Sequence, residues 1–275
     1  MHPLFITDMA IRLKMVLSLL LSAAFLVSTG HGSLLLLELP REIHPLRPRS
    51  GSAGDHVAGL SCLSWRLGVE TNNLIGWKTV PQECEGYVGN YMLGEQYRSD
   101  SRVVAGEALV YAAGLDLAGD GKDVWVFDVD ETTLSNLPYY AKHGFGAEPF
   151  DPTPFNEWVL EGNALVLPES FTLYQKIVSL GIKVVFLTGR TEDQRSVTET
   201  NLKNAGYYTW EKLILNRTSS YSGSTAVTYK SSERGKLEKE GFRIVGNMGD
   251  QWSDLLGTST GLRTFKLPDP MYYIS

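Results

Sequence analysis

Histidine is scarce in this chain, and its placement excludes several kinds of active site. The sequence contains 5 histidines among 275 residues, and only His143 lies beyond residue 56. The body of the chain therefore has too few histidines for a metal site built from several of them, and only one that could belong to a Ser-His-Asp triad. His143 itself is expected on a surface loop.

Positive charge and cysteine are also limited. The formal net charge is −6, and lysine and arginine form no cluster, so a nucleic-acid partner is not expected. An acidic protein that binds an anionic phosphate needs local features instead: a metal ion, a lysine and backbone amides. Neither of the 2 cysteines begins a Cys-x5-Arg string, which excludes a phosphatase with a cysteine nucleophile.

Long hydrophobic runs are absent as well. Arg12 and Lys14 precede an apolar run from Met15 to about Val27, which is shorter than the roughly 20 residues that a membrane span needs. Basic residues, a short apolar core and small residues after it are typical of a signal peptide. We place the signal peptide at residues 1–32, with a signal anchor as the alternative. The prediction is a secreted protein that has no membrane contact after the signal is removed.

The segment after the predicted signal peptide changes in composition. Residues 33–57 show no sustained periodicity and contain many Pro, Arg, Ser and Gly residues, so we predict a flexible arm there and a domain over residues 58–275. Cys62 and Cys84 are the only cysteines. In a secreted chain, an even number of cysteines at this spacing predicts one disulfide. Two free buried thiols are the alternative.

The most informative stretch runs from Asp123 to Asn136. Val124–Phe127 is a short β-branched and aromatic run, which is typical of a strand buried on both faces. Asp128 and Asp130 follow it, and Thr132 lies just beyond. Two carboxylates at the end of a buried strand cost too much desolvation free energy to be there for packing. In open parallel α/β sheets this edge is where ligands bind.

Strand patterns alternate with helix patterns in most of the chain. Further strands are predicted at residues 183–187, 210–215, 243–245 and 263–267, and helices at 91–117, 169–180, 191–205 and 231–240. The alternation predicts an α/β fold with a Rossmann-like parallel sheet and flanking helices. Residues 137–167 interrupt it with prolines and aromatics, and we predict a small cap insertion there. Its aromatic rings either form the core of the cap or stack on an aryl leaving group.

Polar residues also follow the later strands. Thr188 and Gly189 can hold a phosphate oxygen, although the same pair would suit a helix N-cap turn. Lys230 is placed at the start of the helix after a polar loop at 216–228 and can neutralise a phosphate, with Lys236 as its competitor. Asp250 and Asp254 offer oxygen ligands for Mg²⁺, or else cap a helix.

The chemistry of phosphomonoester hydrolysis fits this set of residues. Asp128 can act as the nucleophile, since carboxylates form acyl-phosphate intermediates. Asp130 can protonate the leaving oxygen and later accept a proton from water. The order of acid pair, threonine, lysine and acid pair, each at or just after a strand, is far more specific than any single member.

These motifs resemble the haloacid dehalogenase-like superfamily. Within it they are similar to the plant acid phosphatase and vegetative storage protein family, which is related to class B acid phosphatases. The resemblance covers about Trp65 to Ser275. It rests on five strings: Val-Phe-Asp-Val-Asp-Glu-Thr-Thr-Leu-Ser-Asn (126–136), Leu-Thr-Gly-Arg (187–190), Tyr-Lys-Ser (229–231), Ile-Val-Gly-Asn-Met-Gly-Asp-Gln-Trp-Ser-Asp-Leu (244–255) and Leu-Pro-Asp-Pro-Met-Tyr-Tyr-Ile-Ser (267–275).

The resemblance implies a haloacid dehalogenase-like fold and a secreted (extracellular or cell-wall) or vacuolar Mg²⁺-dependent acid phosphatase that hydrolyses small phosphomonoesters. Asp128 would be nucleophile and metal ligand, Asp130 acid/base and a ligand through its carbonyl, and Asp250 the third ligand. Thr188 and Lys230 would bind phosphate, which favours Lys230 over Lys236. Asp254 would support the metal site, and Arg190 would add a phosphate or substrate contact.

Several alternatives stay open. Some members of the family are storage proteins that have lost the nucleophile; this chain keeps Asp128, which favours an active enzyme. A phosphotransferase is possible because an alcohol can intercept an aspartyl-phosphate, whereas a dehalogenase does not need the acid at Asp130. The sequon at Asn216, in the polar loop, predicts N-glycosylation if the chain is secreted. The sequence does not distinguish a monomer from a homodimer.

Overall fold

The fold is taken from a computed structural model that describes residues 56–57, 60–217 and 223–275. The predicted signal peptide and nearly all of the predicted arm lie outside the described residues. The end of the arm differs from the prediction, because His56–Val57 (β1) pairs antiparallel with Leu60–Ser61 (β2). Within the described residues no helix is both long enough and apolar enough to cross a membrane.

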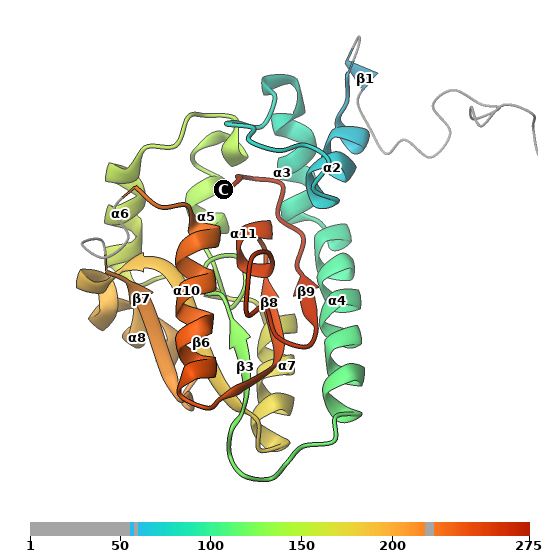
Figure 1. The fold of residues 1–275 in the computed structure, drawn as a ribbon. Coiled ribbons are helices and arrows are strands. Elements are labelled where there is room, and N and C mark those ends of the chain that lie inside the picture. The colour runs from blue at the N-terminus through green and yellow to red at the C-terminus, as the bar shows by residue number, and fades with distance from the viewer. Residues whose placement is uncertain (1–55, 58–59, 218–222) are drawn as a thin grey trace, which may run out of the picture. The chain divides into compact units, whose positions relative to one another are not determined.

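The centre of the fold is a parallel sheet in the order β7-β6-β3-β8-β9, which confirms the predicted α/β class (Figure 1). The strands are β3 (Asp123–Phe127), β6 (Lys183–Thr191), β7 (Lys212–Asn216), β8 (Arg243–Gly249) and β9 (Thr264–Lys266). Because all are parallel, their carboxyl ends meet at one edge, and β3 occupies the middle of the sheet. The residues that follow β3 are therefore flanked by those that follow β6 and β8.

Alternate residues of β3 face two hydrophobic clusters. Trp125 and Phe127 belong to a cluster shared with α4 (Glu95–Ala113) and α7 (Pro168–Ser179). Val124 and Val126 belong to the other cluster, with Tyr229 and Leu237 of α10 (Ala226–Lys239). The period of two in a strand sends successive side chains to opposite faces, so a continuous apolar run is what a strand covered on both faces requires.

The close approach of β3 and β8 depends on a glycine. The register between the two strands shifts by one residue at Val124/Trp125, and Trp125 lies opposite Gly246. A Cβ on Gly246 would lie 2.4 Å from the Trp125 ring, far inside van der Waals contact. Any side chain at Gly246 would therefore push the indole out of the core and separate the two strands that carry the acidic residues.

Three predicted helices differ from the structure. The single helix expected at 91–117 is two, α3 (Glu85–Leu93) and α4, because the chain turns at Gly94. The helix expected at 191–205 begins with a 3₁₀ turn, η3 (Glu192–Gln194), before α8 (Arg195–Asn204). The helix expected from residue 231 begins at Ala226, after the N-cap Thr225, so α10 takes up part of the predicted polar loop.

A set of short elements separates β3 from α7. The strands β4 (Leu134–Ser135) and β5 (Leu165–Val166) pair antiparallel and enclose α5 (Leu137–Tyr140), η2 (Gly144–Gly146) and α6 (Pro152–Glu161). Near the carboxyl end of the chain, α11 (Trp252–Leu255) follows β8. Tyr139, Tyr140 and Phe155 contact one another through their rings, so these aromatics form a small core within the insertion.

The amino-terminal part of the domain is closed by a disulfide between Cys62 and Cys84. Cys62 opens α2 (Cys62–Glu70), and Cys84 ends η1 (Gln82–Cys84). Both cysteines are buried. The disulfide expected from the sequence is confirmed, and the alternative of two free thiols is excluded.

Removing this disulfide should destabilise the protein. Because the bond closes a loop with a sequence separation of 22, the Cys62→Ala/Cys84→Ala variant should lose about 3 kcal/mol of unfolding free energy in the loop-entropy account. Urea unfolding of the oxidised wild type and of the variant measures the difference. A reductant should destabilise the wild type and leave the variant unchanged, and equal stability of the two oxidised proteins would contradict the prediction.

Candidate active site

The loop after β3 places two carboxylates at the middle of the sheet edge. Asp128 and Asp130 follow the last residue of β3, and Asp128 is only 7% exposed. Between them and β4 the chain turns at Glu131, whose φ of 54° lies in the left-handed region. The Glu131 carboxylate accepts hydrogen bonds from the backbone N–H of Asn136 (2.5 Å) and from its side-chain Nδ2 (3.0 Å). These bonds close the loop and offset the cost of the unusual turn at Glu131.

Lys230 joins Asp128 to Asp254. Its Nζ lies 2.6 Å from Asp128 Oδ1 and also donates to Asp254 Oδ1. Burial alone would lower the pKa of Lys230, but the two carboxylates raise it, so the ammonium stays charged. The sequence predicted Lys230 at the start of its helix, but the residue lies in the second turn of α10. The competing Lys236 pairs with Glu233 on the exposed side of the helix.

Asp250 completes a group of three acids. Carboxylate oxygens of Asp128, Asp250 and Asp254 all lie within 4.8 Å of one another, and all three residues are buried. The Thr132 hydroxyl donates to Asp250 Oδ1 at 3.1 Å, which ties the β3 loop to the end of β8.

The electrostatics of this group favour a bound cation. Burial raises the pKa of Asp128 far above its usual range, and the nearby Asp254 and Asp250 raise it further, against the lowering effect of Lys230. Burial and the Asp254 carboxylate raise the pKa of Asp250 in the same way. When these acids are ionised, their negative charge exceeds what the single ammonium of Lys230 balances. Oxygen ligands with excess negative charge fit a hard divalent cation.

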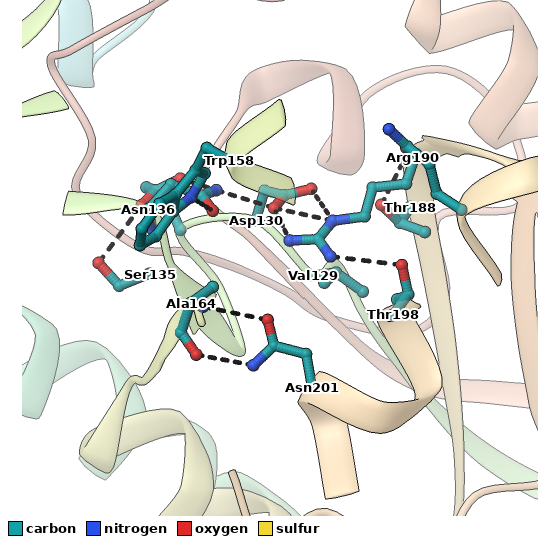
Figure 2. A network of polar contacts seen from close by, with 12 residues as sticks. Val129, Asp130, Ser135, Asn136, Trp158, Ala164, Thr188, Arg190, Thr198 and Asn201 are labelled. Carbon is teal, nitrogen blue, oxygen red and sulfur yellow. Dashed lines mark hydrogen bonds and ion pairs between the residues drawn. The ribbon is translucent and has the colours of Figure 1, made fainter. Parts of the chain in front are cut away.

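Asp130 is held differently from Asp128. Arg190, at the end of β6, contacts both oxygens of Asp130, with Nη2 2.7 Å from Oδ1 and Nε 3.1 Å from Oδ2 (Figure 2). Burial alone would raise the pKa of Asp130, but the charge and hydrogen bonds of Arg190 and a hydrogen bond from Asn136 lower it below the usual value. The guanidinium is in turn anchored by Thr198 of α8 through Nη1 (3.3 Å).

Asn136 connects Asp130 to the insertion. Its Nδ2 donates to Asp130 Oδ1 at 2.8 Å, while its Oδ1 accepts from the indole Nε1 of Trp158 in α6 at 2.9 Å. In Figure 2 the Trp158 ring lies beside Asn136, whose amide is directed at Asp130. Since the indole can only donate, Trp158 fixes which end of the amide faces Asp130.

Comparisons with known proteins identify the family of this chain. A family model described as HAD superfamily, subfamily IIIB (acid phosphatase), matches residues 49–275. The chain belongs to this family. It is therefore an acid phosphatase by class, a phosphoric monoester hydrolase that acts on small phosphoesters.

Relatives with curated names include both enzymes and storage proteins. Acid phosphatase 1 of Solanum lycopersicum is 57% identical over 215 residues, covering 78% of this chain and 84% of that protein. The stem 28 kDa glycoprotein of Glycine max is 52% identical over 85% of this chain and 91% of its own. Vegetative storage protein 2 of Arabidopsis thaliana is 46% identical over 78% of this chain and 80% of its own.

A solved structure shares the fold. The class C acid phosphatase from Bacillus anthracis superposes with a TM-score of 0.57 at 20% identity, covering 70% of this chain and 86% of that one. At this identity the likeness supports the fold alone. It agrees with the expectation of a haloacid dehalogenase-like fold from the sequence.

Two predicted site residues of this acid phosphatase, Thr188 and Gly189, make no hydrogen bond to the acids in the part of the chain that the structure describes. Thr188 is buried, and its hydroxyl accepts from the backbone N–H of Arg190 at 3.1 Å. Gly189 is exposed, with open space where a side chain would lie. Both lie at the end of β6, beside the β3 loop, but no hydrogen bond among the described residues joins them to Asp128 or Asp250. Gly189 is therefore accessible to a ligand, whereas Thr188 is fully buried.

The glycosylation site is placed differently from the expectation. Asn216 is the last residue of β7 and is only partly exposed, whereas the sequence put it in the polar loop. Its side-chain Oδ1 is buried and has no hydrogen-bond partner within the described part of the chain. The third residue of the sequon, at position 218, lies outside the described residues.

Several residues that hold the site together were not predicted from the sequence. Arg234 of α10 is fully buried and donates to the backbone carbonyls of Asp254 and Leu256, each at 2.6 Å. Glu131 and Asp269 add two buried carboxyls, and burial raises the pKa of Asp269 to about 7. An arginine in a helix pattern gives no signal of burial, whereas Glu131, inside the quoted motif, could have been found from its neighbours.

The repulsion among the acids predicts a metal-dependent stability. A divalent cation at ~100 times its dissociation constant should raise the unfolding free energy of the wild type by about 2.7 kcal/mol. In Asp250→Asn the repulsion is relieved and one ligand charge is lost. This variant should be more stable than the wild type in EDTA, and Mg²⁺ should stabilise it less.

Thermal melts of both proteins in EDTA and in a series of Mg²⁺ concentrations provide the measurement. The asparagine can keep its oxygen toward Gln251 and donate to the Thr132 hydroxyl, so the loop has no reason to rearrange. An equal response of wild type and Asp250→Asn to Mg²⁺ would show that Asp250 is not a metal ligand.

Proposed function

We propose that this acid phosphatase hydrolyses small phosphomonoesters through a phosphorylated Asp128, with Mg²⁺ as its cofactor. The observation that supports this most directly is the pairing of Asp128 with Lys230 beside the two acids at the end of β8, Asp250 and Asp254. Asp128, Asp250 and the backbone carbonyl of Asp130 would hold the Mg²⁺. Once bound, the cation would neutralise charge on the transferring phosphoryl group and orient it toward Asp128.

In the first step, a carboxylate oxygen of Asp128 attacks phosphorus, and the bond from phosphorus to the ester oxygen breaks. The leaving oxygen takes a proton from Asp130, so an alcohol departs and an acyl-phosphate remains on Asp128. Lys230 offsets the negative charge of the phosphoryl group, while Thr188 and the amide of Gly189 offer donors to its oxygens.

In the second step, water attacks the phosphorus of phospho-Asp128. Asp130, now ionised, accepts a proton from that water, the acyl-phosphate bond breaks, and inorganic phosphate and the Asp128 carboxylate are released. Asp254 has no direct part in either step. It holds Lys230 in place and accepts a hydrogen bond from the backbone N–H of Gln251 at 2.9 Å, which fixes α11.

We infer that residues 137–167 act as a cap that excludes water from the site, since Trp158 of this segment reaches Asn136 beside Asp130.

The disulfide suits a secreted enzyme, because disulfides are typical of proteins in an oxidising compartment. Together with the predicted signal peptide, it supports an extracellular or vacuolar location, in which Asn216 could be glycosylated.

Removing the nucleophile tests the proposal. Asp128→Asn should lower turnover of an aryl phosphate in mildly acidic buffer with Mg²⁺ by several orders of magnitude, because an amide cannot form the acyl-phosphate. Phosphate release measures the effect, and EDTA should abolish wild-type activity reversibly. The exposed Asp116→Asn serves as a matched control and should keep wild-type turnover.

Two results would contradict the proposal. Near wild-type turnover of a folded Asp128→Asn protein would show that another group is the nucleophile. Negligible turnover of the folded wild type with Mg²⁺ would favour a storage role, with Asp128 as a remnant, as the names of some relatives suggest.

The contact between Arg190 and Asp130 predicts a shift in pH dependence. Because Arg190 lowers the pKa of Asp130, its removal should raise that pKa and keep Asp130 protonated to higher pH. A general acid works in its protonated form, so the alkaline limb of the kcat profile should move to higher pH in Arg190→Gln. Kinetics across pH measure the shift.

Arg195→Gln is the matched control, since this arginine pairs with Glu192 near the surface. It should leave the profile unchanged. An alkaline limb at the wild-type position in Arg190→Gln would show that Asp130 is not the acid, even if kcat itself were reduced by a lost phosphate contact.

A further inference from the structure

The carboxyl-terminal tail, residues 267–275, returns from β9 to the edge of the sheet that carries the acids. It leaves the sheet where the backbone N–H of Leu267 donates to the Gly249 carbonyl at 2.9 Å. Asp269 then turns the chain by accepting from the backbone N–H of Met271 at 2.9 Å. In Figure 1 the tail ends at the point marked C, away from the amino-terminal ends of the strands.

The Tyr272 side chain reaches a proposed metal ligand. Its hydroxyl lies 3.1 Å from Asp250 Oδ2 and 3.4 Å from Glu131 Oε2. A tyrosine hydroxyl has one proton to donate, and the shorter distance assigns it to Asp250. Tyr272 thus contacts both the end of β8 and the loop that carries Asp128 and Asp130.

Asp250 receives a second donor on the same oxygen. The side-chain Nε2 of Gln251 donates to Asp250 Oδ2 at 2.9 Å and to Asp269 Oδ2 of the tail at 3.0 Å. The Oε1 of Gln251 accepts from the backbone N–H of Ile274 at 3.1 Å. Both donors to Asp250 Oδ2 therefore depend on the tail. Oδ1 accepts one hydrogen bond, from the Thr132 hydroxyl, so it keeps a lone pair for a cation at this site.

The tail is fixed along its length. The Tyr272 ring stacks on Tyr140 of α5, with centroids 5.4 Å apart. A Cβ on Gly146 would lie 1.8 Å from the Met271 carbonyl oxygen, so the insertion packs directly on the tail backbone. The terminal Ser275 carbonyl oxygen accepts from the backbone N–H of Ala226, the first residue of α10, at 2.7 Å. The tail thus holds both the start of α10, the helix that carries Lys230, and the Tyr272 hydroxyl that contacts Asp250.

We propose that Tyr272 is a positioning residue for Asp250, and that its hydroxyl orients this carboxylate so that the site binds a divalent cation tightly. The inference rests on the proposed function, because it concerns the same metal site. Hydrogen-bond partners of metal ligands typically contribute about 10–100-fold to metal affinity. Tyr272 has no contact with the substrate in this account and acts through Asp250.

The test compares Tyr272→Phe with the wild type by calorimetric titration of the apo proteins with Mg²⁺. The variant keeps the ring that stacks on Tyr140 and loses only the hydroxyl, so its Mg²⁺ affinity should fall about tenfold. The matched control is Tyr273→Phe in the same tail, where the ring contacts Trp77 at a centroid distance of 6.2 Å. It should bind Mg²⁺ like the wild type.

Activity gives a second readout that a general folding defect would not reproduce. At low Mg²⁺, Tyr272→Phe should turn over an aryl phosphate more slowly than the wild type, and saturating Mg²⁺ should restore its kcat. Equal Mg²⁺ affinities of Tyr272→Phe and wild type would overturn the inference and leave the proposed function intact. A wild-type protein that binds no Mg²⁺ would overturn the metal assignment and the inference together. A defect in Tyr272→Phe that Mg²⁺ does not restore would overturn the positioning role.

Discussion

The mutual repulsion of the buried carboxylates at the ends of β3 and β8 is the constraint on which most of the structure depends. Asp128, Asp250 and Asp254 are almost fully removed from water and stand within a few ångströms of one another. Such a group persists only when donors hold each member. Lys230 spans two of them, Thr132 and Gln251 hold the third, and Arg234 secures the turn behind Asp254. These donors come from the loop after β3, from α10 and from the turn after β8, so the site also joins the elements of the fold.

The parts of the site that could be predicted from sequence are the residues that lie in one strand or in the turn directly after it. A buried strand has a local signature, and in a parallel sheet its end must meet the ends of its neighbours. This is why Asp128, Asp130, Thr188 and Asp250 were predicted together, whereas Arg190 was implied only by the resemblance to a known family. Lys230 and Lys236 were both candidates from the sequence, and only the resemblance to a known family favoured Lys230, because periodicity alone does not show which lysine of a helix turns inward. The helix start was also misplaced, since the N-cap at Thr225 lies within a run of polar residues that looks like a loop.

The contributions of Tyr272, Asn136 and Arg234 could not be derived in this way. Tyr272 is 22 positions from Asp250 in sequence and 141 from Glu131, and nothing in the pattern of the tail indicates that it returns to the site. A tyrosine between a proline-rich turn and the chain end looks like surface. The break of α3 from α4 has a similar origin: Gly94 adopts an extended backbone there, and a Cβ would lie 2.6 Å from the Asn90 carbonyl oxygen. Packing against distant segments decides such details.

The two acids of the β3 loop show how ligands complete the site. In the protein alone, burial and neighbouring acids raise the pKa of Asp128, while Arg190 lowers that of Asp130. Their proposed roles need the opposite, since a nucleophile must be ionised and an acid must hold a proton. A cation beside Asp128 favours its ionised form. A phosphate dianion near Arg190 shares that guanidinium with Asp130 and adds negative charge next to it, which favours the protonated acid. The site is therefore arranged so that cation and substrate together set the charge states that the reaction requires.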